Sequence, residues 1–494
     1  MKLAALTGAA PLQIAQGLIG LGAIAAFTRL LTPEEFGLYA LALSLSMLAH
    51  TVAFTWAEAA AYRFYARAAA EGRLTQHFAL LRRLCAGTAA VFMLAAGCAL
   101  LFAQDPRVAS IIAFAAPSAV LRFYVRIGRE SERAAQMPLR MAAMETLYVA
   151  LGLAAGVGFL LTFDLGAAAP FAGLALAGAL VWLLGSRPPA NMAAPEPSGS
   201  ARAYADYGAP LAAALAVDLG VQALTRMVLA DAAGLSSLGA YAAAFGLARP
   251  LDMIFLWAAA ALTPAIMAAY EQQGAEAART AARRAFELLA AIACPAALGL
   301  AMIGAPLSRL LVGEALATDA AVLLPWLAAS ALASGFGLYY WSEAFQLARR
   351  TGLRALVMLA PGAVQLMLTL LLAPRMGASG AAIAACAAAC VGALMLALVG
   401  RHLIALPLPA ASLARIALAC APMAGVLLLA PTPQSPLQLC FIILCAGSAY
   451  AFSAFLLNIA GVRAVASVLS QALSGRMRAR FQTLFTEKAD GRAR

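Results

Sequence analysis

The chain is a succession of long apolar runs separated by short polar segments. Runs such as 84–103, 141–163 and 355–373 are long enough to cross a hydrocarbon core, which takes roughly 20 residues at about 1.5 Å of rise each. Lipid offers the backbone no hydrogen-bond partners, so each run must be helical, and its continuous rather than alternating apolarity excludes strands. The pattern therefore predicts an all-α, polytopic membrane protein.

We expect about 14 transmembrane helices from these runs. The predicted spans are 8–30, 36–60, 84–103, 108–127, 141–163, 166–185, 208–230, 237–262, 286–307, 320–345, 355–373, 379–400, 411–430 and 437–460. The composition agrees, because 64% of the residues are hydrophobic and 11% are charged, whereas soluble domains have roughly 25% charged residues.

The positive charges are distributed unevenly between the loops. If the N-terminus is cytoplasmic, the inner segments hold 28 of the 34 Lys and Arg residues. This bias predicts that both termini are cytoplasmic. The net charge of +12 is mostly this topological signal, and nucleic-acid binding explains it poorly.

One hydrophilic, Pro-rich stretch, Ser186–Ala203, divides the spans into two groups of six, followed by two more. We predict a two-lobe transporter plan with a parallel repeat, in which substrate binds between the lobes. The predicted boundaries are 1–185 for the N-terminal lobe, 186–205 for a cytoplasmic linker, 206–402 for the C-terminal lobe, 403–460 for spans 13 and 14, and 461–494 for a basic amphipathic tail. A frayed tail with topogenic charges is the alternative for the last segment.

Short internal echoes support the repeat. In 28–40, a Thr-Arg pair is followed by an acid five residues after the Arg and then by Gly-Leu-Tyr-Ala. The same order, with Gly-Ala-Tyr-Ala, occurs in 225–242. A second echo links the outer loops at 165–168 and 376–380. The two sets of six spans therefore match in the same orientation.

Arginines inside the spans are the first candidates for function. Arg29 and Arg226 are repeat partners near outer helix ends, and Arg249 lies near the middle of its span. A mid-membrane Arg costs at least ~2.5 kcal/mol, so it must face water, a carboxylate or a substrate. One guanidinium group can bind two phosphate oxygens at once, so these three arginines could bind a pyrophosphate. Alternatively, Arg29 and Arg226 snorkel to the headgroups beside Glu34 and Asp231.

Acidic residues in the spans are candidates for ion coupling. Asp218 lies in mid-span with no cation within one turn, and Asp252 follows Arg249 by three residues. Asp218 could bind a proton or a cation, or be a hydrogen-bonded protonated carboxyl. Asp252 could equally neutralise Arg249.

Four other polar residues have simpler interpretations. We expect Glu58, Glu145 and Glu343 to form boundary pairs with Arg63, Arg140 and Arg349 at cytoplasmic helix ends. We interpret His50 as a packed core histidine, although a functional role is the alternative.

The sequence contains no nucleophile–base arrangement, Walker loop or metal-binding cluster. Its eight cysteines lie in or beside apolar helices, and it has three histidines, so we expect no metal site. We therefore predict no enzymatic activity and no cofactor, with a H⁺ or Na⁺ gradient as a possible energy source.

The segment 29–41, RLLTPEEFGLYAL, resembles the first-loop signature of bacterial polysaccharide-biosynthesis exporters, the O-antigen and exopolysaccharide flippases. These belong to the multidrug/oligosaccharidyl-lipid/polysaccharide flippase superfamily. The start of the seventh span at 207–211 and the late outer turn at 376–384 are also similar to the family pattern. One departure is Thr225, where the family often has an acid before the Arg, and this puts any coupling role of that acid in doubt.

The resemblance implies an inner-membrane, V-shaped two-lobe bundle. A protein of this kind would move a polyprenyl-pyrophosphate-linked oligosaccharide from the cytoplasmic to the periplasmic leaflet by alternating access, with membrane lipids and other glycan-assembly proteins as partners. A drug/cation antiporter and a lipid II flippase are alternatives of the same superfamily. The antiporter fits poorly, because the candidate residues are mainly cationic and would repel a cationic drug. A membrane-bound glycan polymerase or ligase would need longer outer loops, and a non-transporting scaffold would tolerate loss of the intramembrane charges.

Overall fold

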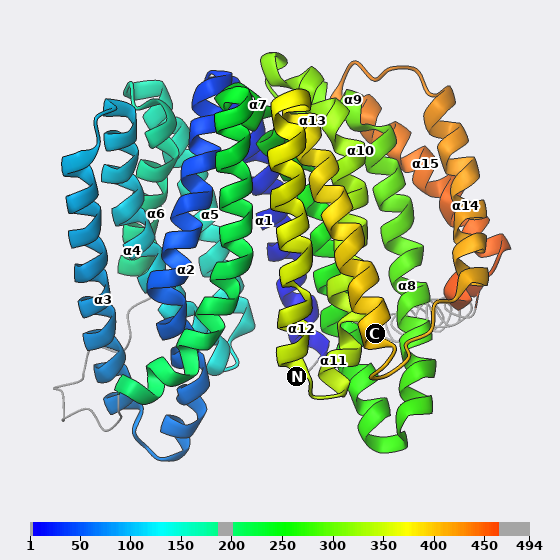
Figure 1. Cartoon of the computed structure of the whole chain (residues 1–494), viewed down its shortest axis with the longest axis horizontal. Helices are drawn as coiled ribbons and strands as arrows, with labels where there is room; N and C mark the ends of the chain where they lie inside the picture. The colour runs from blue at the N-terminus through cyan, green and yellow to red at the C-terminus, as the bar shows by residue number, and fades with distance from the viewer. Residues whose placement is uncertain (1–2, 186–200, 464–494) are drawn as a thin grey trace, which may run out of the picture. The chain divides into compact units, whose positions relative to one another are not determined.

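The computed structural model describes residues 3–185 and 201–463 (Figure 1). These residues are helical with short connections, and no strand occurs among them, so the all-α prediction is confirmed. The helices are α1 (Leu3–Leu30), α2 (Pro33–Ala70), α3 (Leu74–Phe102), α4 (Pro106–Ala134), α5 (Pro138–Thr162), η1 (Gly166–Ala168), α6 (Ala169–Leu184), α7 (Ala201–Gln273), α8 (Ala275–Met302), α9 (Gly304–Leu311), α10 (Glu314–Phe336), η2 (Gly337–Trp341), α11 (Glu343–Leu347), α12 (Thr351–Val357), α13 (Leu359–Gly400), α14 (Ala410–Leu429), α15 (Pro436–Leu456) and η3 (Ile459–Gly461).

In the described part of the chain, 12 helical segments are long and apolar enough to cross a membrane. Two of them contain a glycine with non-helical backbone angles, Gly234 (φ 85°) in α7 and Gly377 (φ 58°) in α13. The 73 residues of α7 would measure about 110 Å as one rod, against a hydrocarbon core of about 30 Å. Each glycine therefore separates two crossings. If the parts of α7 and α13 before and after each glycine are counted as separate crossings, the number agrees with the approximate count of 14 predicted from the sequence.

Three details differ from the predicted spans. The span expected at 286–307 ends at Met302, and the short helix α9 follows it. The span expected at 320–345 passes through the π-helical turn η2. The linker predicted at 186–205 is shorter, because α7 begins at Ala201. Residues 186–200 and the tail after 463 lie outside the described residues.

The helices form two compact units, each built from discontinuous parts of the chain. Unit 1 comprises Met1–Pro250, Leu307–Ser330 and Gly352–Gly392, and unit 2 comprises Leu251–Pro306, Ala331–Thr351 and Ala393–Arg494. The boundaries of the two predicted lobes, which follow the order of the spans, remain a prediction.

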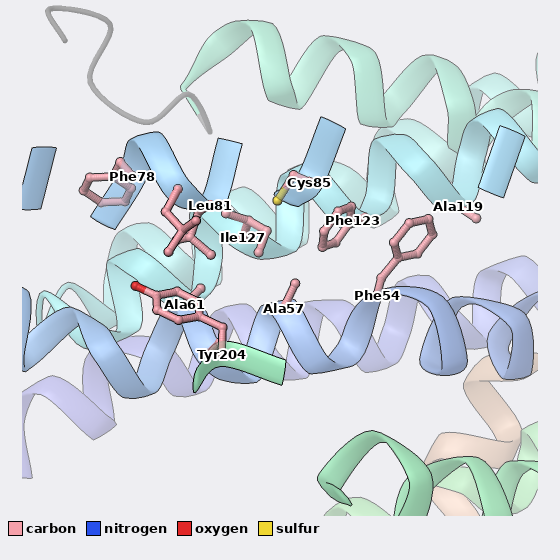
Figure 2. Close-up of a cluster of buried hydrophobic side chains, with 12 residues drawn as sticks. Phe54, Ala57, Ala61, Phe78, Leu81, Cys85, Ala119, Phe123, Ile127 and Tyr204 are labelled. Carbon is pink, nitrogen blue, oxygen red and sulfur yellow. The ribbon is translucent and has the colours of Figure 1, made fainter. Parts of the chain in front are cut away.

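An aromatic cluster between α2, α3 and α4 forms the main core of unit 1 (Figure 2). Phe54 and Phe123 are fully buried and stack with their ring centroids 4.4 Å apart. Small residues such as Ala57 and Ala61 on α2 allow the neighbouring helices to approach closely. Burial of such residues stabilises this part of the unit by packing, since lipid supplies little hydrophobic driving force between helices.

The first turns of α7 pack on this same core. Tyr204 stacks on Phe64 at 4.5 Å and forms a hydrogen bond of 2.5 Å with His77 Nδ1. A methyl group on Gly208 would overlap the carbonyl oxygen of Trp56 in α2. The beginning of the second predicted lobe is therefore held against the helices of the first within unit 1.

The echoed sequence motifs have matching surroundings. A methyl group on Gly37 would overlap the Leu235 carbonyl oxygen, and one on Gly239 would lie 2.7 Å from the Pro33 carbonyl oxygen. Pro33 and Leu235 each precede their own glycine by four residues, so the two motifs contact each other reciprocally. These contacts support a repeat at the level of the backbone.

The second echo behaves in the same way. Gly166 and Gly377 both have positive φ, and they face Glu35 and Ser237, respectively. Glu35 also completes a capping box with Thr32 at the start of α2, accepting a hydrogen bond of 3.1 Å from the Thr32 backbone. The glycine of each outer loop thus faces the other echoed motif of its own half, and at Gly166 this contact is with the capping residue of α2.

Unit 2 has its own core of aromatic and small residues. Phe255, on the second arm of α7, packs with Leu289 of α8 and against the ring of Phe336 at 5.3 Å. The Tyr340 hydroxyl, in the buried π-helical turn, donates to the Pro407 carbonyl at 2.6 Å. The Tyr450 hydroxyl of α15 likewise donates to the Ala291 carbonyl of α8 at 2.6 Å, so α15 is tied to this unit.

We predict that Gly37→Ala destabilises the protein by about 3 kcal/mol, because the added methyl group forces two backbones apart. Gly20→Ala is the matched control, since a methyl group there meets nothing within 4 Å in helix α1. Thermal unfolding in detergent should show a lower melting temperature for Gly37→Ala only. Equal melting temperatures for the two variants would contradict the close approach.

Candidate functional site

Arg29, at the end of α1, is bound by the backbone of a neighbouring segment. Its Nη2 donates to the Leu310 carbonyl at 2.7 Å and its Nη1 to the Leu311 carbonyl at 3.1 Å. These are terminal carbonyls of α9, which no further helical turn satisfies. Arg29 therefore caps α9, which is a structural task that the sequence did not predict.

The adjacent residue strengthens this contact. The Thr28 hydroxyl accepts a hydrogen bond of 3.0 Å from the Gly313 backbone, and Gly313 lies so close that a methyl group on it would overlap the Thr28 carbonyl oxygen. In the described residues Arg29 forms no ion pair, so the expected partner Glu34 does not hold it.

Arg226 has a different environment on the first arm of α7. Its guanidinium carbon lies 5.5 Å from the ring centroid of Phe245, which is on the second arm, so the chain folds back around Gly234. Tyr241 and Arg249 are near enough to act electrostatically on the Arg226 side chain. Two of the three predicted arginines thus lie on the two facing arms of this fold-back.

Arg226 has no carboxylate partner in the part of the chain that the structure describes, so Asp231 does not neutralise it. A cation above an aromatic face keeps its charge and its remaining hydrogen-bond donors available to a ligand. Arg249 adds a second positive charge, and its side chain is exposed just before Pro250. Two guanidinium groups in proximity can bind a polyanion better than either alone.

The two predicted acids lie on the same helix as these arginines. Asp218 is exposed, and its Oδ2 accepts a hydrogen bond of 3.0 Å from Gln222 Nε2, one turn further along α7. Asp252 is also exposed, three residues after Arg249. Pairing of Asp252 with Arg249 remains a hypothesis, as does ion binding at either acid.

A buried charge cluster in unit 1 was not predicted from the sequence. His50 Nε2 lies 2.9 Å from Glu58 Oε1, and Arg126 Nε of α4 lies 3.3 Å from Glu58 Oε2. Glu58 is 4% exposed and His50 5% exposed. Burial of a carboxylate is tolerated when it is paired and hydrogen-bonded, as here. His50 is therefore more than a packed core residue, because its ring forms a hydrogen bond with a buried acid.

The expected boundary pairs are wrong in their partners. Glu58 contacts His50 and Arg126 rather than Arg63. Glu145 pairs with Arg129 at 3.4 Å, whereas Arg140 pairs with Glu132 at 2.8 Å.

The third expected pair differs as well. Glu343 accepts hydrogen bonds from the Thr263 hydroxyl at 3.2 Å and from Gln346 Nε2 at 3.1 Å. Arg349 instead lies 3.8 Å from Glu271. Sequence proximity did not identify these partners, because they come from other helices or from the next turn. The sequence feature that could have predicted the cluster around Glu58 is His50, which lies in mid-span on the same helix.

The comparisons with known proteins agree with this architecture. A family model described as polysaccharide biosynthesis protein matches residues 26–318. No relative among curated proteins matches the chain. A solved structure of the lipid II flippase MurJ in an inward closed conformation is similar, with a TM-score of 0.73 and 12% identity over 91% of this chain and 98% of that one.

Two structures of MOP superfamily transporters are also similar. An inward-facing MATE family multidrug resistance transporter of the MOP superfamily has a TM-score of 0.63 and 16% identity, over 79% of this chain and 94% of that one. A MOP superfamily transporter from Pyrococcus furiosus has a TM-score of 0.51 and 18% identity, over 81% and 93%. At these identities the likeness establishes the fold alone.

We predict that Arg126→Met destabilises the protein by about 3 kcal/mol, because it removes the arginine that pairs with the buried Glu58. Arg133→Met on the same helix is the control, since Arg133 is 58% exposed and its ion pair with Glu130 is solvated. Thermal unfolding of both variants in detergent should show a large loss for Arg126→Met and little change for Arg133→Met. Similar losses would mean that the buried cluster is not a stabilising unit.

Proposed function

We propose, from the premise that this chain belongs to the polysaccharide biosynthesis protein family, that it flips a polyprenyl-pyrophosphate-linked oligosaccharide across the membrane. The oligosaccharide would be a repeat unit of an O-antigen or an exopolysaccharide, moved from the cytoplasmic to the periplasmic leaflet by alternating access. The lipid-linked substrate would be the principal partner, beside membrane lipids and other glycan-assembly proteins. The protein would act as a transporter and not as an enzyme.

The observation that carries this function is the Arg226 guanidinium, which lies over the Phe245 ring without a carboxylate partner among the described residues, with Arg249 further along the same second arm of α7. A pyrophosphate carries two adjacent phosphoryl groups, and guanidinium forks bind such oxygens with charge-assisted hydrogen bonds. A cationic drug would be repelled by the same two charges, which disfavours the antiporter alternative. Arg29 remains a predicted third contact, although both of its Nη atoms already donate to carbonyls.

The orientation that we propose follows from the distribution of charge. The chain is a multi-pass membrane protein with 12 apolar helices in its described residues. The excess of Arg and Lys in alternate loops favours an inner-membrane location with both termini in the cytoplasm. In this orientation Arg226 lies nearer the outer end of its crossing and Arg249 nearer the middle, so a pyrophosphate could pass from one to the other.

We expect that Arg226→Ala and Arg249→Ala each reduce surface glycan export by about tenfold or more, because a charge-assisted bidentate contact worth ~1.5–3 kcal/mol is lost. The Lys variants should retain part of the activity, since they keep the charge without the fork. Arg309→Ala is the control, because Arg309 is an exposed residue of α9. Glycan export is measured on cells, with protein level measured by immunoblot. Normal export in both Ala variants would refute this assignment.

Ion coupling at Asp218 is the second part of the proposed mechanism, with Asp252 as the alternative position. An exposed carboxylate on a membrane-spanning helix can bind a proton or Na⁺ from a water-filled cavity. Its hydrogen bond to Gln222 holds the carboxylate in place without neutralising it.

We predict that Asp218→Asn lowers transport driven by a proton or sodium gradient in proteoliposomes by about tenfold, because the amide cannot exchange the ion. Asp206→Asn is the matched control at the start of the same helix, where Asp206 is exposed and lies 3.8 Å from Arg202. Gradient-driven transport that is as fast in Asp218→Asn as in the control would exclude this coupling site, and Asp252→Asn would then be tested in the same way.

A further inference from the structure

A cavity of about 350 Å³ in unit 2 lies apart from the residues discussed above. It is formed by α8, by the beginning of α14 and by the turn 458–461 that follows α15. Its charged lining residues are Arg283, Arg284, Arg415 and Glu287. Three guanidinium groups against one carboxylate give the cavity a net positive charge.

The carboxylate is already engaged by its neighbours. Glu287 Oε1 lies 3.3 Å from Arg283 Nε and accepts a hydrogen bond of 2.8 Å from the Ser412 hydroxyl. Arg284 and Arg415 form no ion pair within residues 3–185 and 201–463. Both are exposed, so their donors point to a space that an anion can enter.

The donors left for an anion are the guanidinium groups. The Thr280 hydroxyl also lines the cavity, but it already donates to the Glu276 carbonyl at 3.1 Å. The turn contains Asn458, Ala460 and Gly461, all with positive φ, and Ala460 adopts this conformation at a cost because it has a Cβ atom. The turn brings the end of α15 to the cavity wall. Guanidinium donors around a cationic hollow are typical of sites that bind phosphate groups.

Three exposed leucines, which we call the leucine rim, neighbour the lining residues along the chain. Leu288 follows Glu287, Leu418 lies one turn after Arg415, and Leu456 precedes the turn by two residues; each is at least 41% exposed. Such side chains on a membrane protein contact acyl chains. The arginines belong to segments that the charge distribution places on the cytoplasmic side, where anionic lipids attract basic residues. A free phosphate would use the same donors but not the leucine rim.

We propose that this cavity binds the phosphate group of an anionic membrane phospholipid, with the headgroup on Arg284 and Arg415 and the acyl chains along the leucine rim. The site is independent of the flipped substrate and of the arginines on α7. Its occupancy would fix the cytoplasmic ends of α8 and α14 against the end of α15.

The test uses the full-length protein in detergent and native mass spectrometry with added dioleoylphosphatidylglycerol or dioleoylphosphatidylcholine. The double variant Arg284→Ala/Arg415→Ala should bind phosphatidylglycerol about fivefold more weakly or worse than the wild type, because two charge-assisted contacts are lost. Glu287→Gln should bind it more tightly, because the cavity loses its negative charge. The two variants therefore predict shifts in opposite directions.

The matched control is Arg349→Ala/Arg350→Ala, which removes two exposed positive charges outside the cavity lining. It should change binding by less than about twofold, since these charges make no contact with the headgroup and are screened. Inorganic phosphate is added in a parallel arm. If phosphate competes with phosphatidylglycerol, the phosphate group alone is enough for binding; if it does not, the acyl chains are also needed. Both results support the site. Equal binding of the two lipids, or unchanged phosphatidylglycerol binding in the Arg284→Ala/Arg415→Ala variant, would overturn the proposal.

Discussion

The hydrocarbon interior of a membrane offers no hydrogen-bond partners, and this constraint determines how the chain satisfies its polar groups. The backbone does so by forming helices. Where a helix ends inside the protein, another group must take over, as Arg29 does for the carbonyls of α9. Where an acid is buried, a cation from another helix must reach it, as Arg126 does for Glu58.

Arg226 stands out against this background. Its described neighbours are an aromatic ring, a tyrosine and a second arginine, none of which neutralises it. A positive charge without an acidic partner inside the membrane lowers the stability of the protein. We therefore expect that Arg226 uses its charge in function. The fold-back of α7 at Gly234 places Arg226 and Arg249 on facing arms, and the reciprocal contact of Gly37 and Gly239 holds the adjacent helix ends together. Close glycine packing and the cation of Arg226 are thus features of the same unit.

The fold was largely predictable from the sequence, and the partners of charged side chains were not. Apolar length determines the crossings, because each must span a core of fixed thickness, and even the break at Gly234 falls between two predicted runs. The short helix α9 was missed, since the apolar run continues through Met302 into it. The partners of Glu58 and Glu145 were predicted from their neighbours in sequence. They are on other helices or in other turns, and only the packing of α2, α4 and α5 decides them.

The most direct measurement is a leaflet-resolved flipping assay with purified protein in liposomes and a fluorescent polyprenyl-pyrophosphate-linked sugar. The account predicts that the wild-type protein moves the labelled lipid between leaflets, that a polyprenyl lipid without the pyrophosphate is not moved, and that the Arg226→Ala/Arg249→Ala protein moves neither. Movement of the labelled lipid by the double variant at the wild-type rate would contradict the claim that this arginine pair binds the pyrophosphate.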